Sequence, residues 1–317
     1  MKIVLKPYNE HYMNCYLNNL FSIGCSINEN IRKLSYVNDY NITIISEGNF
    51  NYLLFDYGKD FYRTIYRNVV GKTSGDDFNM YENPLGNKMY LNSSFVEEII
   101  QVLNDGNIVF LLVDLFYCNN GNIFYRKEHR NHFLLIVDWI PDQNCFISID
   151  EGKKGYGYYQ ITHEEIKLLV TDTLSAFCLN VSSKKITRST QFNLENIAFN
   201  SNRICNQIDE IKESFGELSI PKNYSELCHL IIFIHRCYNR QLSNSYLVNE
   251  IIHVDSPKTH NPFYMLEELK SGWYNTRAVI LHDIMSGKNI DFEYCFNNIL
   301  LSLEKEAEFW KVVKRMI

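Results

Sequence analysis

A histidine and an aspartate stand near the two ends of a stretch that has the pattern of a β-hairpin. The stretch reads NHFLLIVDWIPDQNCFISIDE over Asn131–Glu151, two apolar runs joined by a turn at residues 141–144. If Leu134 pairs with Asp150, His132 becomes a diagonal neighbour of Asp150 on the same face, about 7 Å away at the backbone. A register shifted by one residue would place the two side chains on opposite faces. The register therefore decides whether a carboxylate can orient His132, as a catalytic histidine requires.

The nucleophile that would complete such a site is Cys15. Apolar residues at helical spacing predict a helix that begins near Asn14 and ends at Gly24. Cys15 then lies in the first helical turn, where unpaired N–H groups and the helix dipole lower a thiol pKa. The competing interpretation is an ordinary buried thiol, because free cysteines are usually buried and the chain has nine of them.

Cys15, His132 and Asp150 follow one another in the order found in papain-type enzymes. In those enzymes an early cysteine lies on a helix, a later histidine on a strand, and an Asn or Asp on the next strand. The chemistry needs a thiolate, a base within hydrogen-bond reach and a carboxylate that fixes the imidazole tautomer. The spacing is loose, so the residue pattern alone leaves both a catalytic triad and three unrelated residues open.

A metal site is a weaker interpretation of the same region. His129 and His132 are separated by two residues, and Cys118 could be a third ligand. The two histidines stand at a loop–strand junction and do not share a face, and the sequence offers no fourth ligand. We therefore expect no metal.

The run RKEHR before the hairpin contains Arg126, Lys127 and Arg130. Such a run is usually a solvated face. Its position beside His132 also allows these cations to contact a phosphate at the mouth of a cleft.

Composition excludes several classes of protein. The 317 residues carry a net charge of −6, which gives no electrostatic footprint for nucleic acid or an anionic membrane. The apolar runs are too short to span a membrane, and the start, MKIVLKPYNEH, has no signal-type apolar region. Cysteines without CxxC pairs suit a reducing compartment. We expect a cytoplasmic enzyme with no bound cofactor.

The elements that position the three residues predict an α+β domain over residues 1–187. Capping boxes at Ser94–Glu97 and Thr162–Glu165 predict helices, with apolar strands over 108–117 and 176–181. Residues 36–66 are rich in aromatic side chains without a clear period, which is compatible with a substrate cleft or with ordinary core. Residues 188–317 show helical patterns only, including a helix that Pro262 begins and Gly272 ends, and predict an all-helical domain or lid.

Three segments resemble the N-terminal domain of butirosin-type acyltransferases, which are relatives of bacteriocin-processing, papain-fold peptidases. The segments are NEHYMNCYLNNLFSIG, IVFLLVDLFY and HFLLIVDWIPDQNCFISIDEG, and the resemblance extends over roughly residues 5–181. It implies a papain-like fold and transfer of an acyl group from a carrier-protein phosphopantetheine thioester to an amine. Carried over by position, it implies Cys15 as nucleophile, His132 as base and Asp150 as the orienting carboxylate. Relatives in this family build nonribosomal amides and thioamides.

The resemblance is incomplete at the expected oxyanion hole. Papain-fold peptidases have Gln six residues before the cysteine, and Asn9 stands there in this chain. Butirosin-type members often have His directly before the cysteine, whereas this chain has Asn14 there and its histidine at position 11. Asn9, His11 and Asn14 are therefore candidate donors beside the Cys15 backbone N–H.

The leading expectation is a cysteine-dependent acyltransferase of specialised metabolism. Its partners would be an acyl or peptidyl carrier protein, whose phosphopantetheine arm enters as part of the substrate, and a small amine or diamine. The same triad would also serve a hydrolase, either a thioesterase or a peptidase, with water as acceptor. A third alternative is a non-catalytic partner that binds the carrier protein.

Overall fold

The computed structural model divides the chain into two compact units. The first contains Met1–Leu34 and Tyr62–Thr190, and the second contains Ser35–Phe61 and Gln191–Ile317. The sequence predicts that residues 35–61 belong to the N-terminal domain, whereas the structure groups them with the second unit. The structure describes residues 4–70, 87–89, 94–119, 124–152, 155–170, 176–179, 193–251 and 261–317.

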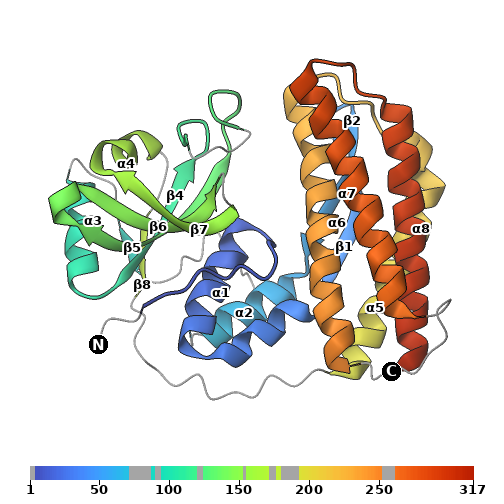
Figure 1. Cartoon of the computed structure of the whole chain (residues 1–317), viewed down its shortest axis with the longest axis horizontal. Coiled ribbons are helices and arrows are strands. Elements are labelled where there is room, and N and C mark those ends of the chain that lie inside the picture. The colour runs from blue at the N-terminus through green and yellow to red at the C-terminus, as the bar shows by residue number, and fades with distance from the viewer. Residues whose placement is uncertain are drawn as a thin grey trace. The chain divides into compact units, whose positions relative to one another are not determined.

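The first unit is built on a six-stranded antiparallel sheet with the strand order β3-β8-β4-β5-β6-β7 (Figure 1). Its strands are β3 (Asn87–Met89), β4 (Ile108–Asp114), β5 (Asn131–Ile140), β6 (Cys145–Gly152), β7 (Gly155–Thr162) and β8 (Ala176–Leu179). Its helices are α1 (Cys15–Ile27), α3 (Phe95–Asn104), η2 (Pro141–Gln143) and α4 (His163–Leu169). The chain passes from one unit to the other within η1 (Glu29–Tyr36) and again within α2 (Lys59–Val70). The architecture of the protein is α+β.

The expected register of the central hairpin is confirmed. Leu135 pairs with Ile149 and Ile136 with Ser148, which is the alignment that sets Leu134 opposite Asp150. The turn at residues 141–144 is a 3-10 turn that ends at Asn144 in the left-handed conformation, with φ of 49°. Asn tolerates that conformation better than most residues. A β-bulge follows Ile136 on β5 without changing the register at the His132 end.

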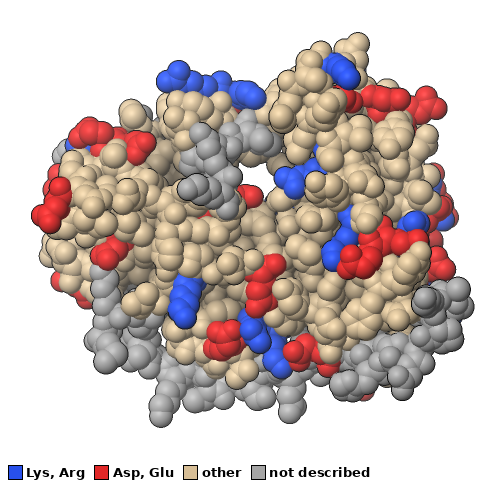
Figure 2. Space-filling view, viewed as in Figure 1, with Lys and Arg blue, Asp and Glu red and all other residues tan. Residues whose placement is uncertain are grey.

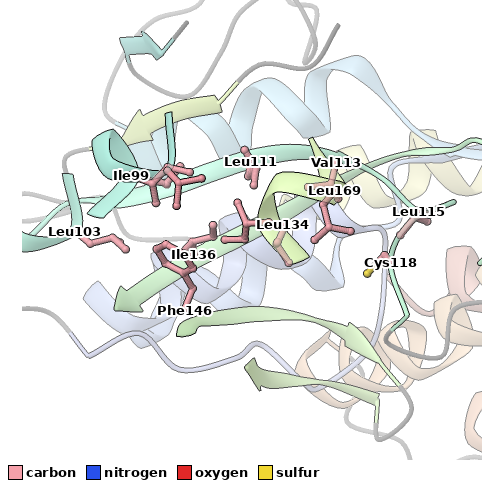
Figure 3. Packing of buried hydrophobic residues seen from close by; sticks show 13 residues of the cluster. Ile99, Leu103, Leu111, Val113, Leu115, Cys118, Leu134, Ile136, Phe146 and Leu169 are labelled. Atoms are coloured by element: carbon pink, nitrogen blue, oxygen red, sulfur yellow. The ribbon is translucent and has the colours of Figure 1, made fainter. Parts of the chain in front are cut away.

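The two faces of this sheet are covered by different helices. Alternate residues of β4 and β5, such as Leu111 and Leu134, point into an apolar cluster with Ile99 of α3 and Leu169 of α4 (Figure 3). Helix α1 packs against β5 and β6, and Tyr16 of α1 meets the ring of Phe133 edge-on. Because Phe133 alternates with Leu134, α1 covers the opposite face from α3 and α4. The start of α1 is thereby fixed against the strands that carry His132 and Asp150.

The second unit combines helices with a β-hairpin. Strands β1 and β2 pair along their whole length and pack on α5 and α6, so the expectation of an all-helical domain needs correction. Tyr40 of β1 is fully buried and its hydroxyl hydrogen-bonds Glu306. The aromatic run over residues 36–66 gave no clear period because it spans the end of η1, both strands of the hairpin and the start of α2. The elements are β1 (Tyr40–Glu47), β2 (Phe50–Tyr57), α5 (Leu194–Ser214), η3 (Phe215–Glu217), α6 (Tyr224–Ile251), α7 (Pro262–Ser286) and α8 (Phe292–Met316).

Two glycines that were expected to end helices lie inside them instead. Helix α1 continues past Gly24, where a Cβ atom would lie 2.8 Å from Ile31 and 2.9 Å from Val69. Helix α7 continues past Gly272, where a Cβ atom would lie 2.9 Å from the Ser302 hydroxyl. Both glycines permit close packing rather than termination, a distinction that helical spacing alone does not carry.

The capping predictions had mixed outcomes. Thr162 and Glu165 form the expected capping box at α4. Ser94 precedes α3 as expected, but its side chain makes no capping hydrogen bond and its hydroxyl donates to Glu98 instead.

In the described part of the chain, no helix is both long and apolar enough to cross a membrane. Acidic and basic side chains are interspersed on the face that Figure 2 displays.

Candidate active site

The candidate site lies where β5 and β6 stop pairing. The ladder between the two strands ends at Leu135 and Ile149. In the part of β5 before Leu135, no residue pairs with β6. The backbone of Phe133 bonds to α1 instead. Its N–H donates to Cys15 Sγ at 3.5 Å, and its carbonyl accepts from Asn19 Nδ2 at 2.9 Å. The first turns of α1 thus meet backbone groups of β5, and this holds the thiol beside the strand that carries His132.

Cys15 is the first residue of α1, as the sequence predicted. Asn14 is the N-cap, and its side-chain oxygen accepts from Leu17 N at 2.9 Å. The Asn14 amide nitrogen donates to the hydroxyl of Tyr62 at 2.8 Å. These bonds fix the backbone that carries the thiol at the positive end of the helix dipole.

His132 and Asp150 form a buried pair. His132 Nε2 lies 2.5 Å from Asp150 Oδ1, and the two side chains are 8% and 3% exposed. The side chain of His132 also hydrogen-bonds Cys15. Since Asp150 occupies Nε2, the other ring nitrogen is the one available to the thiol. The structure therefore brings the three predicted residues together in the order thiol, imidazole, carboxylate.

The site favours a thiolate beside an imidazolium. Burial by itself would raise the pKa of the Cys15 thiol, but the charge of His132 and hydrogen bonds from His132 and the Phe133 N–H outweigh it and lower the pKa. Burial by itself would lower the pKa of His132, but Asp150 and Cys15 raise it well above its usual value. Cys25, on the same helix, shows the opposite behaviour, because burial and nearby carboxylates raise its pKa to about 12.

A buried polar network, which the sequence does not predict, joins α1 to β7 beside the site. The hydroxyl of Tyr156 on β7 donates to Asn19 Oδ1 at 2.5 Å and lies 3.2 Å from the Ser22 hydroxyl. Burial raises the pKa of Tyr156 well above its usual value, and the negative charges of Asp150 and Cys15 add to that shift. The pair Asn18-Asn19, inside an otherwise apolar stretch of helix, was the available signal for this network. Nothing in the sequence pointed to Tyr156.

The three candidate oxyanion donors have different surroundings. Asn9 is exposed on the surface. His11 is buried, and its Nδ1 lies 3.3 Å from the hydroxyl of Tyr8. Asn14 caps α1 and hydrogen-bonds Tyr62. Their role as oxyanion donors stays a prediction.

The candidate phosphate-binding cations stand on the segment that leads into β5. Arg126 and Lys127 are exposed, and the Arg126 guanidinium lies over the ring of Tyr125. Arg130 is half-buried and forms an ion pair with Glu128 at 2.8 Å. Their contact with a carrier protein stays a prediction.

His129 and His132, the two histidines of the alternative metal interpretation, have different carboxylate partners. His129 Nδ1 lies 2.5 Å from Asp114 Oδ2, whereas His132 pairs with Asp150. Among the residues that the structure describes, no group of three or more His, Cys, Asp or Glu side chains could hold a metal ion.

A cavity of about 400 Å³ lies beside the buried pair. Its described walls come from β6, β7, α4 and the turn after β4, and they include Asp150 but not Cys15 or His132. The cavity therefore reaches the orienting carboxylate without reaching the thiol.

Comparison with known proteins leaves the site to be interpreted from its geometry. No protein-family model matches the chain, and no curated protein matches it either.

Proposed function

We propose that this protein is a cysteine-dependent acyltransferase that forms an amide from a carrier-bound thioester. The observation that carries the proposal is the contact of Cys15, at the start of α1, with His132, which Asp150 holds through Nε2. A helix with a cysteine at its start, packed on an antiparallel sheet with the base and carboxylate, is the arrangement of a papain-like enzyme, and we propose that fold for the first unit. The resemblance of the three quoted segments to butirosin-type acyltransferases supports the choice of reaction.

The first half-reaction exchanges one thioester for another. The Cys15 thiolate attacks the thioester carbonyl, and the bond from the carbonyl carbon to the phosphopantetheine sulfur breaks. The departing thiolate takes the proton of the His132 imidazolium, so the acyl-enzyme stands beside a neutral imidazole. Because a thioester replaces a thioester, this step is close to balanced in free energy.

The second half-reaction uses that neutral imidazole as a base. An amine attacks the acyl carbon on Cys15, and His132 takes a proton from the nitrogen. Collapse of the intermediate expels the Cys15 thiolate and releases the amide, which restores the thiolate–imidazolium pair. Asp150 stabilises the imidazolium and fixes which ring nitrogen faces the reaction.

A hydrolase is the second candidate, and one observation favours it. The Cys15 side chain is only half-buried in the structure, so water can approach the thiol. With water in place of the amine, the same three residues would release a carboxylic acid.

The test compares acceptors on a preformed acyl-enzyme. The full-length protein is incubated with a simple acyl thioester, and the intact mass is followed after dilution into buffer or into a small amine. Faster discharge by the amine, with an amide as product, is the expected result. Discharge at the same rate in buffer, with free acid as the only product, would overturn the transferase in favour of the hydrolase.

A further inference from the structure

The cavity beside Asp150 is the feature of the first unit that the proposed reaction does not use. Its volume of about 400 Å³ is within the range of small-molecule sites. Buried apolar groups such as Cys118 and Leu169 line it together with three tyrosines. A ligand inside it would therefore meet both aromatic and polar surface.

The charges at this cavity have one sign. Asp150 and Glu165 line it, and none of the described lining residues is a Lys, Arg or His. The Cys15 thiolate and the His132 imidazolium behind Asp150 have opposite charges that cancel, so the net charge at the cavity is that of its two carboxylates. The raised pKa of the neighbouring Tyr156, to which both Asp150 and Cys15 contribute after burial, reflects the same negative potential.

We propose that this cavity is a binding site for a small organic ammonium ion, distinct from the acyl site. An ammonium group can lie against the carboxylates, and its hydrocarbon part can pack against the tyrosine rings. A neutral molecule of the same shape would gain only the second interaction. Because neither Cys15 nor His132 lines the cavity, a molecule held there does not occupy the acyl position.

Asp150 connects this site to the thiol. Ser148 and Asp150 alternate with Ile149 on β6 and face the side of the sheet that carries α4, whereas α1 covers the other side. From the cavity toward α1 the groups therefore follow in the order Asp150, His132, Cys15. A cation in the cavity is closer to the imidazolium than to the thiolate, so it disfavours the ion pair and returns the proton to Cys15. Binding of the ammonium ion should slow reactions of the thiol; this second part rests on the thiolate–imidazolium pair of the proposed function.

The experiment measures alkylation of Cys15 by iodoacetamide in the full-length protein as propylammonium is added, with 1-propanol as the neutral probe of similar shape. Ionic strength is held constant with sodium chloride. We expect saturable slowing by propylammonium and none by 1-propanol. Equal slowing by both probes, or no saturation, would overturn the proposal.

Two matched variants locate the effect. Asn119 is exposed in the turn after β4 and lines the cavity, so Asn119→Lys places a competing ammonium at its wall. Gln101 is exposed on α3 and does not line it, so Gln101→Lys makes the same change of charge elsewhere. One charge at a partly exposed site is worth up to about fivefold in affinity, so Asn119→Lys should raise the half-saturating concentration about fivefold and Gln101→Lys should leave it unchanged. An equal change in both variants would contradict the site.

A direct binding measurement separates this proposal from the catalytic one. Ligand-observed nuclear magnetic resonance with propylammonium on Cys15→Ala protein reports the cavity without a thiol. Binding that Asn119→Lys weakens in this background would support the site even if no acyl transfer were ever observed. Absence of such binding in Cys15→Ala and in wild type alike would overturn the site and leave the acyltransferase untouched.

Discussion

The first unit contains two histidine–aspartate pairs whose histidines stand three positions apart in the chain, and they have the same contact distance. His132 lies 2.5 Å from Asp150, and His129 lies 2.5 Å from Asp114. The first pair is buried, with side chains 8% and 3% exposed, whereas the His129 side chain is 65% exposed. A short contact between imidazole and carboxylate therefore does not by itself identify a catalytic group.

The partners of the two pairs explain the difference. Asp114 also accepts from the backbone N–H groups of Phe116 and Arg130, so it holds together the two ends of the segment between β4 and β5. His129 stacks on the ring of Phe116 at 4.3 Å. His132 instead faces a thiol at the start of a helix. The outer pair, His129 and Asp114, stabilises a turn, whereas the inner pair, His132 and Asp150, can change the protonation of the Cys15 thiol.

The largest expected effect is the difference in acyl-transfer rate between variants of the two histidines. His132→Gln should lower the rate of acyl transfer by about 10⁴-fold or more, because the thiolate and the base are lost together. His129→Gln should stay within about threefold of wild type, because its side chain is 65% exposed and pairs with Asp114 rather than with the thiol. Steady-state assays with a thioester and an amine measure both, and circular dichroism checks the fold of each variant. Similar losses in the two variants would remove the basis for choosing His132.

Variants of the two aspartates should lose different properties: Asp150→Asn should lose activity, and Asp114→Asn should lose stability. Asp150→Asn favours the wrong imidazole tautomer, so the rate should fall by about 10²- to 10⁴-fold. Asp114→Asn removes the charged acceptor of two backbone N–H groups, so the free energy of unfolding should fall by about 1–3 kcal/mol with activity retained. Chemical denaturation and the transfer assay on both proteins provide the comparison. An Asp114→Asn protein as inactive as Asp150→Asn would show that the outer pair belongs to the site.

The pH dependence of thiol alkylation follows from the shifted pKa values. The thiolate of Cys15 is lost only as pH falls through its lowered pKa, so alkylation by iodoacetamide should persist below the ordinary thiol pKa of about 8.5. In His132→Gln the unopposed effect of burial raises the pKa, so the same rate should require a higher pH. Alkylation followed by peptide mass spectrometry from about pH 5 to 9 measures both profiles. His129→Gln is the control, and a profile shifted as far as that of His132→Gln would count against the assignment.

The smallest expected effect concerns the hydrogen bond from Tyr156 to Asn19, which joins β7 to α1 beside the inner pair. Tyr156→Phe leaves Asn19 Oδ1 without its donor, so the free energy of unfolding should fall by about 1–2 kcal/mol. Tyr159 donates to the Gly155 carbonyl in an exposed position, so Tyr159→Phe should change stability by less than about 0.5 kcal/mol. Urea denaturation of the two variants tests the contrast. Equal stability of both would mean that the Tyr156 bond does not support α1.

The local parts of the site could be predicted from the sequence. The hairpin register follows from alternating apolar residues and a turn, so the approach of His132 to Asp150 could be inferred from 131–151 alone. The start of α1 at Cys15 follows from the N-cap residue Asn14 and helical spacing. Both are decided by neighbours in the chain.

The remaining parts depend on contacts between distant residues. The association of β1 and β2 with α5 and α6 joins segments more than a hundred positions apart, as in the hydrogen bond from Gln207 to Asn41. The bond from Tyr156 to Asn19 is of the same kind, with 137 positions between the two residues. Gly24 and Gly272 appear as helix ends until the packing partner is known. Local patterns carry no information on such pairings.

The most direct test of the central claim uses the two half-buried cysteines of α1. The protein is treated with less than one equivalent of a simple acyl thioester, and the modified residue is mapped by peptide mass spectrometry. Cys15 has a lowered pKa and Cys25 has one raised to about 12, so the acyl group should be found on Cys15. It should remain there in Cys25→Ala and disappear from Cys15→Ala. An acyl group on Cys25, or one that persists in Cys15→Ala at the wild-type rate, would contradict the assignment of Cys15 as the nucleophile.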